Sequence, residues 1–351
     1  MIRTTPFTLI SLLLIATGCQ QMGYSDRPQP SGSDSAARRD LRDLRQHTFA
    51  DDDRTRYLGP NLTPDQSTLL FTLYKKEGRT SYQTDIYSKP VNGKAKSQRT
   101  FNGEDDWSGS VSPDGSKIAY VTTRNGTADI FVMNLAGGRA KRQITSGEQT
   151  DIAPSWSHDG SKIAFSRYSE SAKEWDIWTF DLLTGSLTSL VPGLYPRYSP
   201  VDDTLLFQRW DSTLGHYALW TVDSGAFNES EIAASGTASF VTPRWSPDGK
   251  KIVFCSGGNL IAKSRTKSFY SKRVTFGSAE DEWKFRTNDI WVVDRDGSGR
   301  TQLTDTEEGE FSPFWGSDGR IYFSLDRDGA VNIWSALPDT VEVSATVETI
   351  E

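Results

Sequence analysis

Acidic and basic side chains recur at one place in this 351-residue sequence, a fixed distance before a turn of the Pro-Asp-Gly type. Asp106, Asp151 and Glu310 each stand eight residues before the aspartate of such a turn. Further into the same kind of segment, Arg197 and Arg244 occupy positions where other copies have serine. If the fold gathers these carboxylates around a common axis, they could hold a cation or cationic peptide groups. Arginines in the same place could bind carboxylates and amides. The alternative is that these side chains only line a water-filled polar channel, in which their charges balance one another and bind no ligand.

An active site needs more than these charges, and the remaining inventory is poor. The three histidines, His47, His158 and His216, fall in different parts of the chain, so neither a triad base nor a histidine-rich metal site is indicated. The sequence has no G-x-S-x-G nucleophile motif. The run Asp294–Gly299 lacks the terminal glutamate of a calcium loop and is typical of a turn. We therefore expect no enzyme, metal site or cofactor, and leave carboxylate chemistry of the lyase or glycosidase type as the alternative.

The N-terminal segment has the layout of a secretory signal. Residues 1–18 contain a basic start, an apolar run too short to span a membrane, and small residues before Cys19. This arrangement resembles the bacterial lipobox, which implies cleavage before Cys19 and a lipid on its thiol. An ordinary cleaved signal with an incidental cysteine is the alternative. Lipid chains would anchor the protein to a membrane, and Gln20 favours the outer membrane of the cell envelope, with the protein facing the periplasm.

The rest of the chain divides into a polar stretch and a repetitive one. Residues 19–50 cannot bury enough apolar surface to fold alone, so we expect a flexible, lipidated tether. Residues 51–351 contain the repeats described below. Cys255 lies in an apolar strand pattern and is expected to be a buried thiol. The formal net charge of −7 argues against a nucleic-acid-binding protein.

Two sequence markers alternate along residues 51–351, six times each. The first is a strand pattern ending in a turn, such as SVSPDG at Ser110, and the second is an apolar strand headed by Asp or Asn, such as DIF at Asp129. Most neighbouring copies lie 42 to 49 residues apart, and one gap of about 70 indicates an insertion at about 257–286. Each copy contains four short segments rich in β-branched and aromatic residues, separated by Gly, Asn and Asp turns.

A single four-stranded meander leaves its faces and edges exposed, whereas six such units around an axis cover one another. The sequence therefore predicts an all-β protein, a six-bladed β-propeller of four-stranded antiparallel blades. Residues after Pro338 could supply the outer strand of the last blade, or residues near Arg54–Leu58 could close the ring.

The repeat WSPDGxxIAFxS…DIWxxD…GxxxxLT resembles that of the TolB propeller, which is related to WD-repeat propellers. The resemblance covers roughly Tyr57 to Pro338 and implies the fold. TolB carries a separate α/β domain before its propeller and is a soluble periplasmic protein, whereas a lipid-anchored tether is expected to precede the repeats in this sequence. The resemblance therefore does not imply membership of the Tol–Pal machinery, since similar repeats occur in envelope lipoproteins and peptidase propellers.

Binding is expected where the copies differ, in loops on the face where the first strand of each blade begins. Those loops contain Trp175 and Trp210, and the insertion contains Trp283, with basic residues early and acidic residues late. Aromatic side chains together with arginine and lysine are typical of binding hot spots. The alternative for the insertion is a hairpin that packs on its own blade.

These features predict a non-catalytic envelope lipoprotein whose propeller binds a protein, a peptide or a peptidoglycan-derived ligand at the channel face. The expected ligand-binding residues are Asp106, Asp151, Arg197, Arg244, Glu310, Trp175, Trp210 and Trp283. The alternatives are a carbohydrate-active propeller enzyme, either a lyase or a glycoside hydrolase, and a glycan-binding protein that does not cleave.

Overall fold

The computed structural model describes residues 41–50, 54–77, 82–137, 141–225, 227–257, 288–306, 308–327 and 329–339. The expected signal segment, Cys19 with its lipid, most of the expected tether, and the expected insertion with Trp283 lie outside the described residues. All regular elements in the described ranges are β-strands. Within those ranges no helix has the length and apolar character needed to cross a membrane.

Four sheets of four antiparallel strands follow one another along the described chain. Their strands are β6–β9 (Asp106–Val111, Lys117–Thr122, Asp129–Asn134, Lys141–Gln143), β10–β13 (Thr150–Trp156, Lys162–Ser169, Glu174–Asp181, Leu187–Pro192), β14–β17 (Leu194–Tyr198, Thr204–Asp211, His216–Asp223, Glu229–Ala233) and β18–β21 (Ser239–Trp245, Lys251–Gly257, Asp289–Asp294, Thr301–Gln302).

A fifth sheet in the described part of the chain has eight strands, in the order β22-β23-β24-β2-β3-β4-β5, with β1 paired to β24. Its strands are β1 (Arg42–Gln46), β2 (Thr55–Leu62), β3 (Thr68–Lys76), β4 (Tyr82–Pro90), β5 (Ser97–Gln98), β22 (Gly309–Trp315), β23 (Ile321–Arg327) and β24 (Ala330–Leu337).

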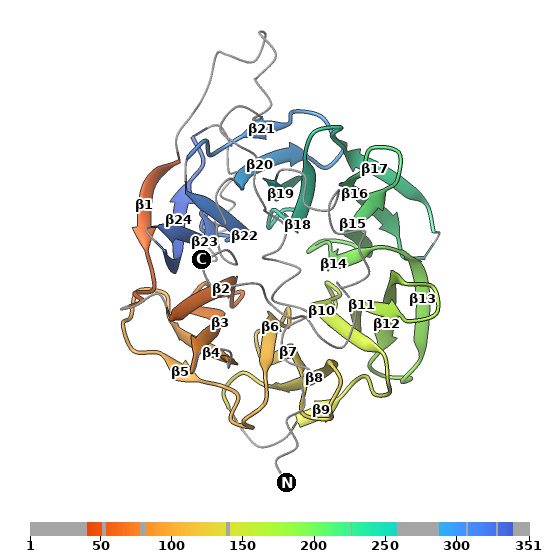
Figure 1. The fold of residues 1–351 in the computed structure, drawn as a ribbon, viewed down its shortest axis with the longest axis horizontal. Helices are drawn as coiled ribbons and strands as arrows, with labels where there is room; N and C mark the ends of the chain where they lie inside the picture. The colour runs from red at the N-terminus through yellow and green to blue at the C-terminus, as the bar shows by residue number, and fades with distance from the viewer. Residues whose placement is uncertain are drawn as a thin grey trace, which may run out of the picture.

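The sheets stand around one axis like the blades of a propeller (Figure 1). Each first strand contacts the first strands on either side, so that the described residues form a closed inner ring made of β2, β6, β10, β14, β18 and β22. The prediction of an all-β propeller with four-stranded antiparallel blades is confirmed. The predicted count of six separate blades is corrected to four separate blades and one eight-stranded sheet, because a parallel bridge between Arg56 and Val331 joins β2 to β24.

The hydrophobic core lies between neighbouring sheets. Leu70 and Ile86 of one sheet, for example, pack with Ile118 and Tyr120 of the next, and all four side chains are buried. Cys255 is fully buried, as the apolar pattern predicts, and its Sγ donates to Glu310 O at 3.5 Å. Since a sheet covers its apolar faces only when both neighbours are present, the stability of each sheet depends on closure of the ring.

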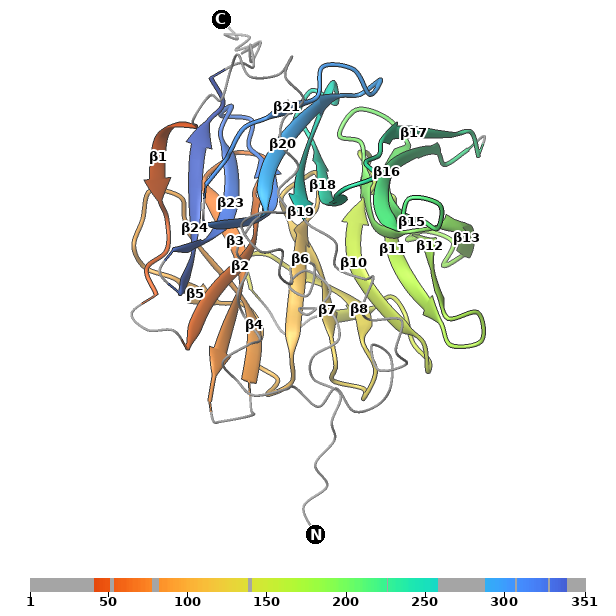
Figure 2. The same ribbon diagram turned by 45° about the horizontal axis from the view of Figure 1, so that its top comes forward.

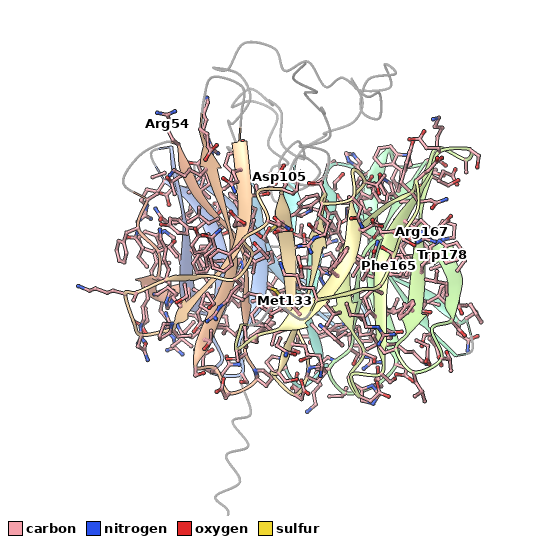
Figure 3. All side chains as sticks on the ribbon, turned by 90° about the horizontal axis from the view of Figure 1, so that it is seen from below. Arg54, Asp105, Met133, Phe165, Arg167 and Trp178 are labelled. Atoms are coloured by element: carbon pink, nitrogen blue, oxygen red, sulfur yellow. The ribbon has the colours of Figure 1, made fainter. Side chains whose placement is uncertain are left out.

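The repeated tryptophans hold this packing in two ways. Trp156 Nε1 donates to Ser110 O at 3.0 Å, which ties β10 to β6 of the preceding sheet. On the third strands β12, β16 and β24, the indole is covered by an arginine from the second strand of its own sheet. The Arg167 guanidinium lies 4.9 Å from the centre of the Trp178 ring and 5.3 Å from that of the Phe165 ring. Figure 3 labels these three residues on the same sheet. Both contacts explain the recurrence of tryptophan by packing.

The N-terminal strand β1 occupies the outer edge of the eight-stranded sheet, outside β24 (Figure 2). It takes the place that a fourth strand holds in the other sheets. Gln46 Nε2 donates to Thr48 O at 2.8 Å, and Gln143, the last residue of β9, makes the same bond to Thr145 O at 2.8 Å. Residues 42–46 were expected to be part of the tether, and neither of the two expected ways of closing the ring involved them.

A buried arginine fastens β1 to the sheet. Arg320 donates to Ser335 Oγ at 2.8 Å and to Asp43 Oδ2 at 2.7 Å. His47 Nε2 lies 2.8 Å from the same Ser335 Oγ, and burial lowers the pKa of His47 to about 4. The imidazole is therefore neutral at pH 7, and its Nε2 accepts a hydrogen bond from the Ser335 hydroxyl. The Lys89 ammonium completes the contact by donating to the His47 carbonyl at 2.8 Å.

Thr48→Val tests whether this N-terminal segment holds the ring. Thr48 Oγ1 accepts from the Ile333 backbone N–H at 2.8 Å and donates to Asn332 Oδ1 at 3.2 Å. Valine keeps the shape and leaves the buried N–H without an acceptor, which is expected to cost about 2 kcal/mol of unfolding free energy. Chemical denaturation measures the loss. Thr188→Val, on an exposed residue of β13, is the control, and equal stability of the two variants would contradict this role of Thr48.

Candidate functional site

The three predicted carboxylates occupy equivalent places near the start of β6, β10 and β22, but they are buried. Asp106, Asp151 and Glu310 have exposed fractions of 0%, 1% and 2%. Spacing along the sequence places them correctly on the first strands. It does not reveal that each side chain turns into a contact within or between sheets. From the sequence we expect these acids to face a ligand at the channel mouth. In the structure their side chains are buried and do not do so.

Each carboxylate has a partner in the described chain. Asp151 forms a two-pronged ion pair with Arg167, its cross-strand neighbour on β11, with both N–O distances 2.7 Å. Glu310 Oε1 accepts from Thr306 Oγ1 at 2.6 Å. Asp106 Oδ1 accepts from Asn102 Nδ2 at 3.2 Å. Each of the three acids thus bonds to another group of the described chain, and none belongs to a cluster of His, Cys, Asp or Glu there that could hold a metal ion.

A backbone bulge recurs at one level of the inner ring. Where each first strand changes its register with the second strand, one residue has a positive φ between 51° and 61°. These residues are Gly59, Ser108, Ala153, Tyr195, Thr242 and Ser312. A left-handed conformation costs an L-residue roughly 1 kcal/mol, so the surroundings must hold it. Ser166 Oγ does so for Tyr195 by accepting its N–H at 2.9 Å. Bulges of this kind re-aim the groups that follow them.

Arg197 and Arg244 follow two of these bulges, on β14 and β18, and we call them the arginine pair. Arg197 extends toward the adjacent first strand, β10, where its Nη1 donates to Ala153 O at 3.3 Å. The same Nη1 donates to the carbonyl of the preceding residue, Pro196, at 2.9 Å. Arg197 Nε is buried and has no hydrogen-bond partner among the described residues. Arg244 lies on the neighbouring first strand, close enough for the two charges to affect each other. Both side chains are half-buried.

The electrostatics of the arginine pair are unfavourable in the free protein. Burial lowers the pKa of Arg197 to about 10. Burial and the charge of Arg197 also lower the pKa of Arg244 well below its ordinary value. The ion pairs in the described ranges include neither arginine. Since buried charges are normally paired, the arrangement favours an anion between the two guanidinium groups.

The predicted aromatic residues are not gathered around this pair. Trp175 is buried against Tyr168, with ring centroids 5.2 Å apart. Trp210 lies near the end of β15, is 36% exposed and packs edge-on against Tyr217 of β16, so part of its ring remains accessible on this hairpin. Trp283 lies outside the described residues. Of the predicted aromatic residues that the structure describes, Trp210 alone offers a surface to a partner.

Groups for metal or base chemistry are dispersed in the described part of the chain. Clusters of three or more His, Cys, Asp or Glu that could hold a metal ion are not found among those residues. His47 is buried in the β1 contact, His158 lies 3.3 Å from Asp203, and His216 Nε2 lies 3.2 Å from Gly236 O. The arrangement that stands out chemically is therefore the arginine pair.

Comparison with known proteins agrees with this architecture. Residues 40–211 match the TolB beta propeller domain family. A protein assigned as TolB from Agrobacterium tumefaciens is 21% identical, with a TM-score of 0.58 over 80% of this chain and 90% of that one. The fold is a TolB-type propeller.

Two further similarities connect this TolB-type propeller to enzymes. An oligogalacturonate lyase from Vibrio parahaemolyticus is 15% identical, with a TM-score of 0.54 over 86% of this chain and 96% of that one. Dipeptidyl-peptidase 5 of Porphyromonas gingivalis is 44% identical over 48 residues, which are 13% of this chain and 7% of that protein. The chain thus matches a small part of the length of this curated relative. At these identities the structural similarities show the fold alone.

The buried acids make the stability of this propeller depend on pH. Burial raises the pKa of Glu310 to about 8 and that of Asp105 to about 7. A raised carboxyl pKa stabilises the fold below the unfolded pKa, near 4, and this contribution is lost as the pH rises through the folded pKa. Between pH 5 and pH 8 we expect these two groups to lower the unfolding free energy by several kcal/mol, since each contributes about 1.4 kcal/mol per pH unit between its unfolded and its folded pKa. Urea denaturation at each pH measures this fall.

Glu310→Gln should reduce that pH dependence, because glutamine keeps an acceptor for Thr306 and does not titrate. The exposed Glu231→Gln is the matched control. The same pH slope in both variants would contradict the assignment.

Opposite effects on stability should separate the structural acid from the arginine pair. Asp151→Asn leaves the Arg167 guanidinium without its buried partner, at an expected cost of about 3 kcal/mol. Arg244→Gln removes a charge that lacks an ion-pair partner in the described chain and is repelled by Arg197, so the unfolding free energy of the ligand-free protein should rise by about 1 kcal/mol. Chemical denaturation of both variants beside the wild type measures whether the unfolding free energy falls in the first variant and rises in the second. A destabilised Arg244→Gln would show that the guanidinium is neutralised within the protein.

Proposed function

We propose that the protein is a lipoprotein of the bacterial cell envelope whose propeller binds an acidic ligand without transforming it. A lipid on Cys19 would hold it at the outer membrane, with the ring facing the periplasm on a tether that ends near β1. Counting the eight-stranded sheet as two four-stranded units, the ring would be six-bladed. The ligand would be a protein, a peptide or a peptidoglycan-derived fragment, bound at the face where the first strands begin.

The arginine pair is the observation that supports this proposal. The protein as a whole carries a formal charge of −7, yet its inner ring holds two half-buried arginines outside the ion pairs of the described residues. A positive site attracts an anionic ligand. The negative charge of the rest of the protein repels most other acidic proteins, so the attraction is confined to a ligand that reaches this site. The exposed Trp210, on the hairpin between β15 and β16, offers an aromatic contact to the same partner.

A second candidate is a carbohydrate-active enzyme. It is favoured by similarity to the oligogalacturonate lyase fold and by the same positive ring, which would suit an acidic polysaccharide. The acids that such chemistry would draw on are buried and bonded to arginine, threonine or asparagine. We therefore place binding before catalysis.

Capture from solubilised envelope tests the proposal. The full chain serves as bait beside two variants, Arg197→Glu with Arg244→Glu, and Lys250→Glu. Lys250 lies in the turn between β18 and β19, six residues after Arg244 and past the end of the first strand, and its side chain is 75% exposed. We expect the wild type and the Lys250 variant to retain one partner that the arginine variant loses at least tenfold, because the reversed charges repel an acidic ligand.

Equal capture by all three baits would move the binding site away from the arginine pair. Cleavage of an acidic polysaccharide by the wild type, lost in the arginine variant, would favour the enzyme. Capture and polysaccharide turnover are measured on the same preparation, so that the two functions are compared directly.

A further inference from the structure

The two arginines of the pair differ in whether their guanidinium N–H groups already donate to acceptors of the protein. Arg197 is fixed by the Ala153 and Pro196 carbonyls, which occupy Nη1. Its Nε is buried without a partner in the described chain. None of the hydrogen bonds or ion pairs described in this structure involves the Arg244 guanidinium, which can therefore turn toward a ligand. One fixed and one adjustable guanidinium can close on a single oxyanion from two sides.

The backbone beside the pair adds acceptors to these donors. The Ala153 carbonyl belongs to a residue with a φ of 58°, at the bulge of β10, and it reaches the Arg197 guanidinium from that position. A carbonyl oxygen has two lone pairs, and the Arg197 N–H occupies one of them. The Pro196 carbonyl is in the same situation. An N–H group of a ligand could therefore be accepted within a few ångströms of the oxyanion.

The inner ring carries small or uncharged side chains at the positions equivalent to the arginine pair. These are Asn61, Ser110, Ser155 and Phe314, which pair with second strands in the same register as the arginines. Asn61, Ser110 and Ser155 are buried, and Phe314 is half-buried. The ring thus offers one concentrated positive charge at this level and small polar or apolar neighbours around it. Such a setting suits a narrow ligand end better than a broad acidic surface.

We infer that the arginine pair captures the free carboxylate at the end of a peptide chain, while the Ala153 and Pro196 carbonyls receive its last amide N–H. This inference rests on the proposed function and names the group that is recognised. A terminal residue presents a carboxylate and an amide N–H a few ångströms apart, which matches the donors and acceptors of the site. Inorganic phosphate supplies the anion without the N–H, and a C-terminal amide supplies the N–H without the anion.

Isothermal titration of the full chain with four probes tests the inference. The probes are acetyl-L-Ala-L-Ala, acetyl-D-Ala-D-Ala, acetyl-L-Ala-L-Ala amide and inorganic phosphate. We expect at least one free acid to bind, with the amide and phosphate at least tenfold weaker. The stereochemistry separates the sources, because ordinary protein chain ends carry L-residues and peptidoglycan stems can end in D-alanine.

Arg244→Gln should weaken the binding of the dipeptide free acid at least tenfold. Lys250→Gln, on the exposed turn, should leave the affinity for the same acid within twofold of the wild type. Since the described hydrogen bonds and ion pairs do not include the Arg244 guanidinium, the variant is expected to fold, and circular dichroism checks this. Tight binding of the amide, stronger binding of phosphate, an unchanged Arg244→Gln affinity, or no binding of either free acid would each overturn the inference.

The outcome is separable from that of the envelope capture. A partner retained through the arginine pair, together with no affinity for either dipeptide acid, would keep the proposed function and overturn the chain-end inference. Binding of a dipeptide acid with no partner captured would keep the inference and remove the proposed macromolecular partner.

Discussion

Closure of the ring is the constraint on which the rest of this structure depends. A sheet of the propeller has two apolar faces, and each is covered only by the neighbouring sheet. The pairing of β1 with β24 and the bridge from β24 to β2 bring the two ends of the described chain into one eight-stranded sheet. The buried Arg320, bonded to Asp43 and Ser335, connects the N-terminal strand to that sheet. Without this junction the faces at the two ends of the chain would be left in contact with water.

The closed ring also sets the electrostatics of its centre. Because the first strands contact one another around the axis, side chains that project from neighbouring first strands share a confined space. Arg197 and Arg244 are held together there although their charges repel, whereas Asp151 and Arg167 are held together by attraction. A natural sequence keeps a destabilising pair of this kind when function requires it, since stability elsewhere in the fold offsets the cost. The arginine pair thus differs in kind from the ion pairs that support the sheets.

The sequence predicts the repeated parts well and the exceptional parts poorly. Strand pairs and turns follow from local chemistry, so markers such as SPDG and DIW place them, and the burial of Cys255 follows from its apolar neighbours. β1 was missed because it lies in a polar stretch, and its sheet partner is nearly 300 residues away in sequence. The available signal was the Q-x-T pattern of Gln46 and Thr48, which repeats at Gln143 and Thr145 with the same hydrogen bond. The burial of Asp106 and Glu310 could not be predicted, since spacing fixes a position along a strand and not the partner that the side chain meets.

The arginine pair forms a positive centre that no acid among the described residues neutralises. A crystal of the protein soaked in bromide tests this most directly, because the anomalous signal of bromide marks a small anion without regard to shape. We expect a bromide ion between the guanidinium groups of Arg197 and Arg244, at higher occupancy than at any surface lysine. A carboxylate of the chain itself between the two guanidinium groups, with no bromide there, would contradict it.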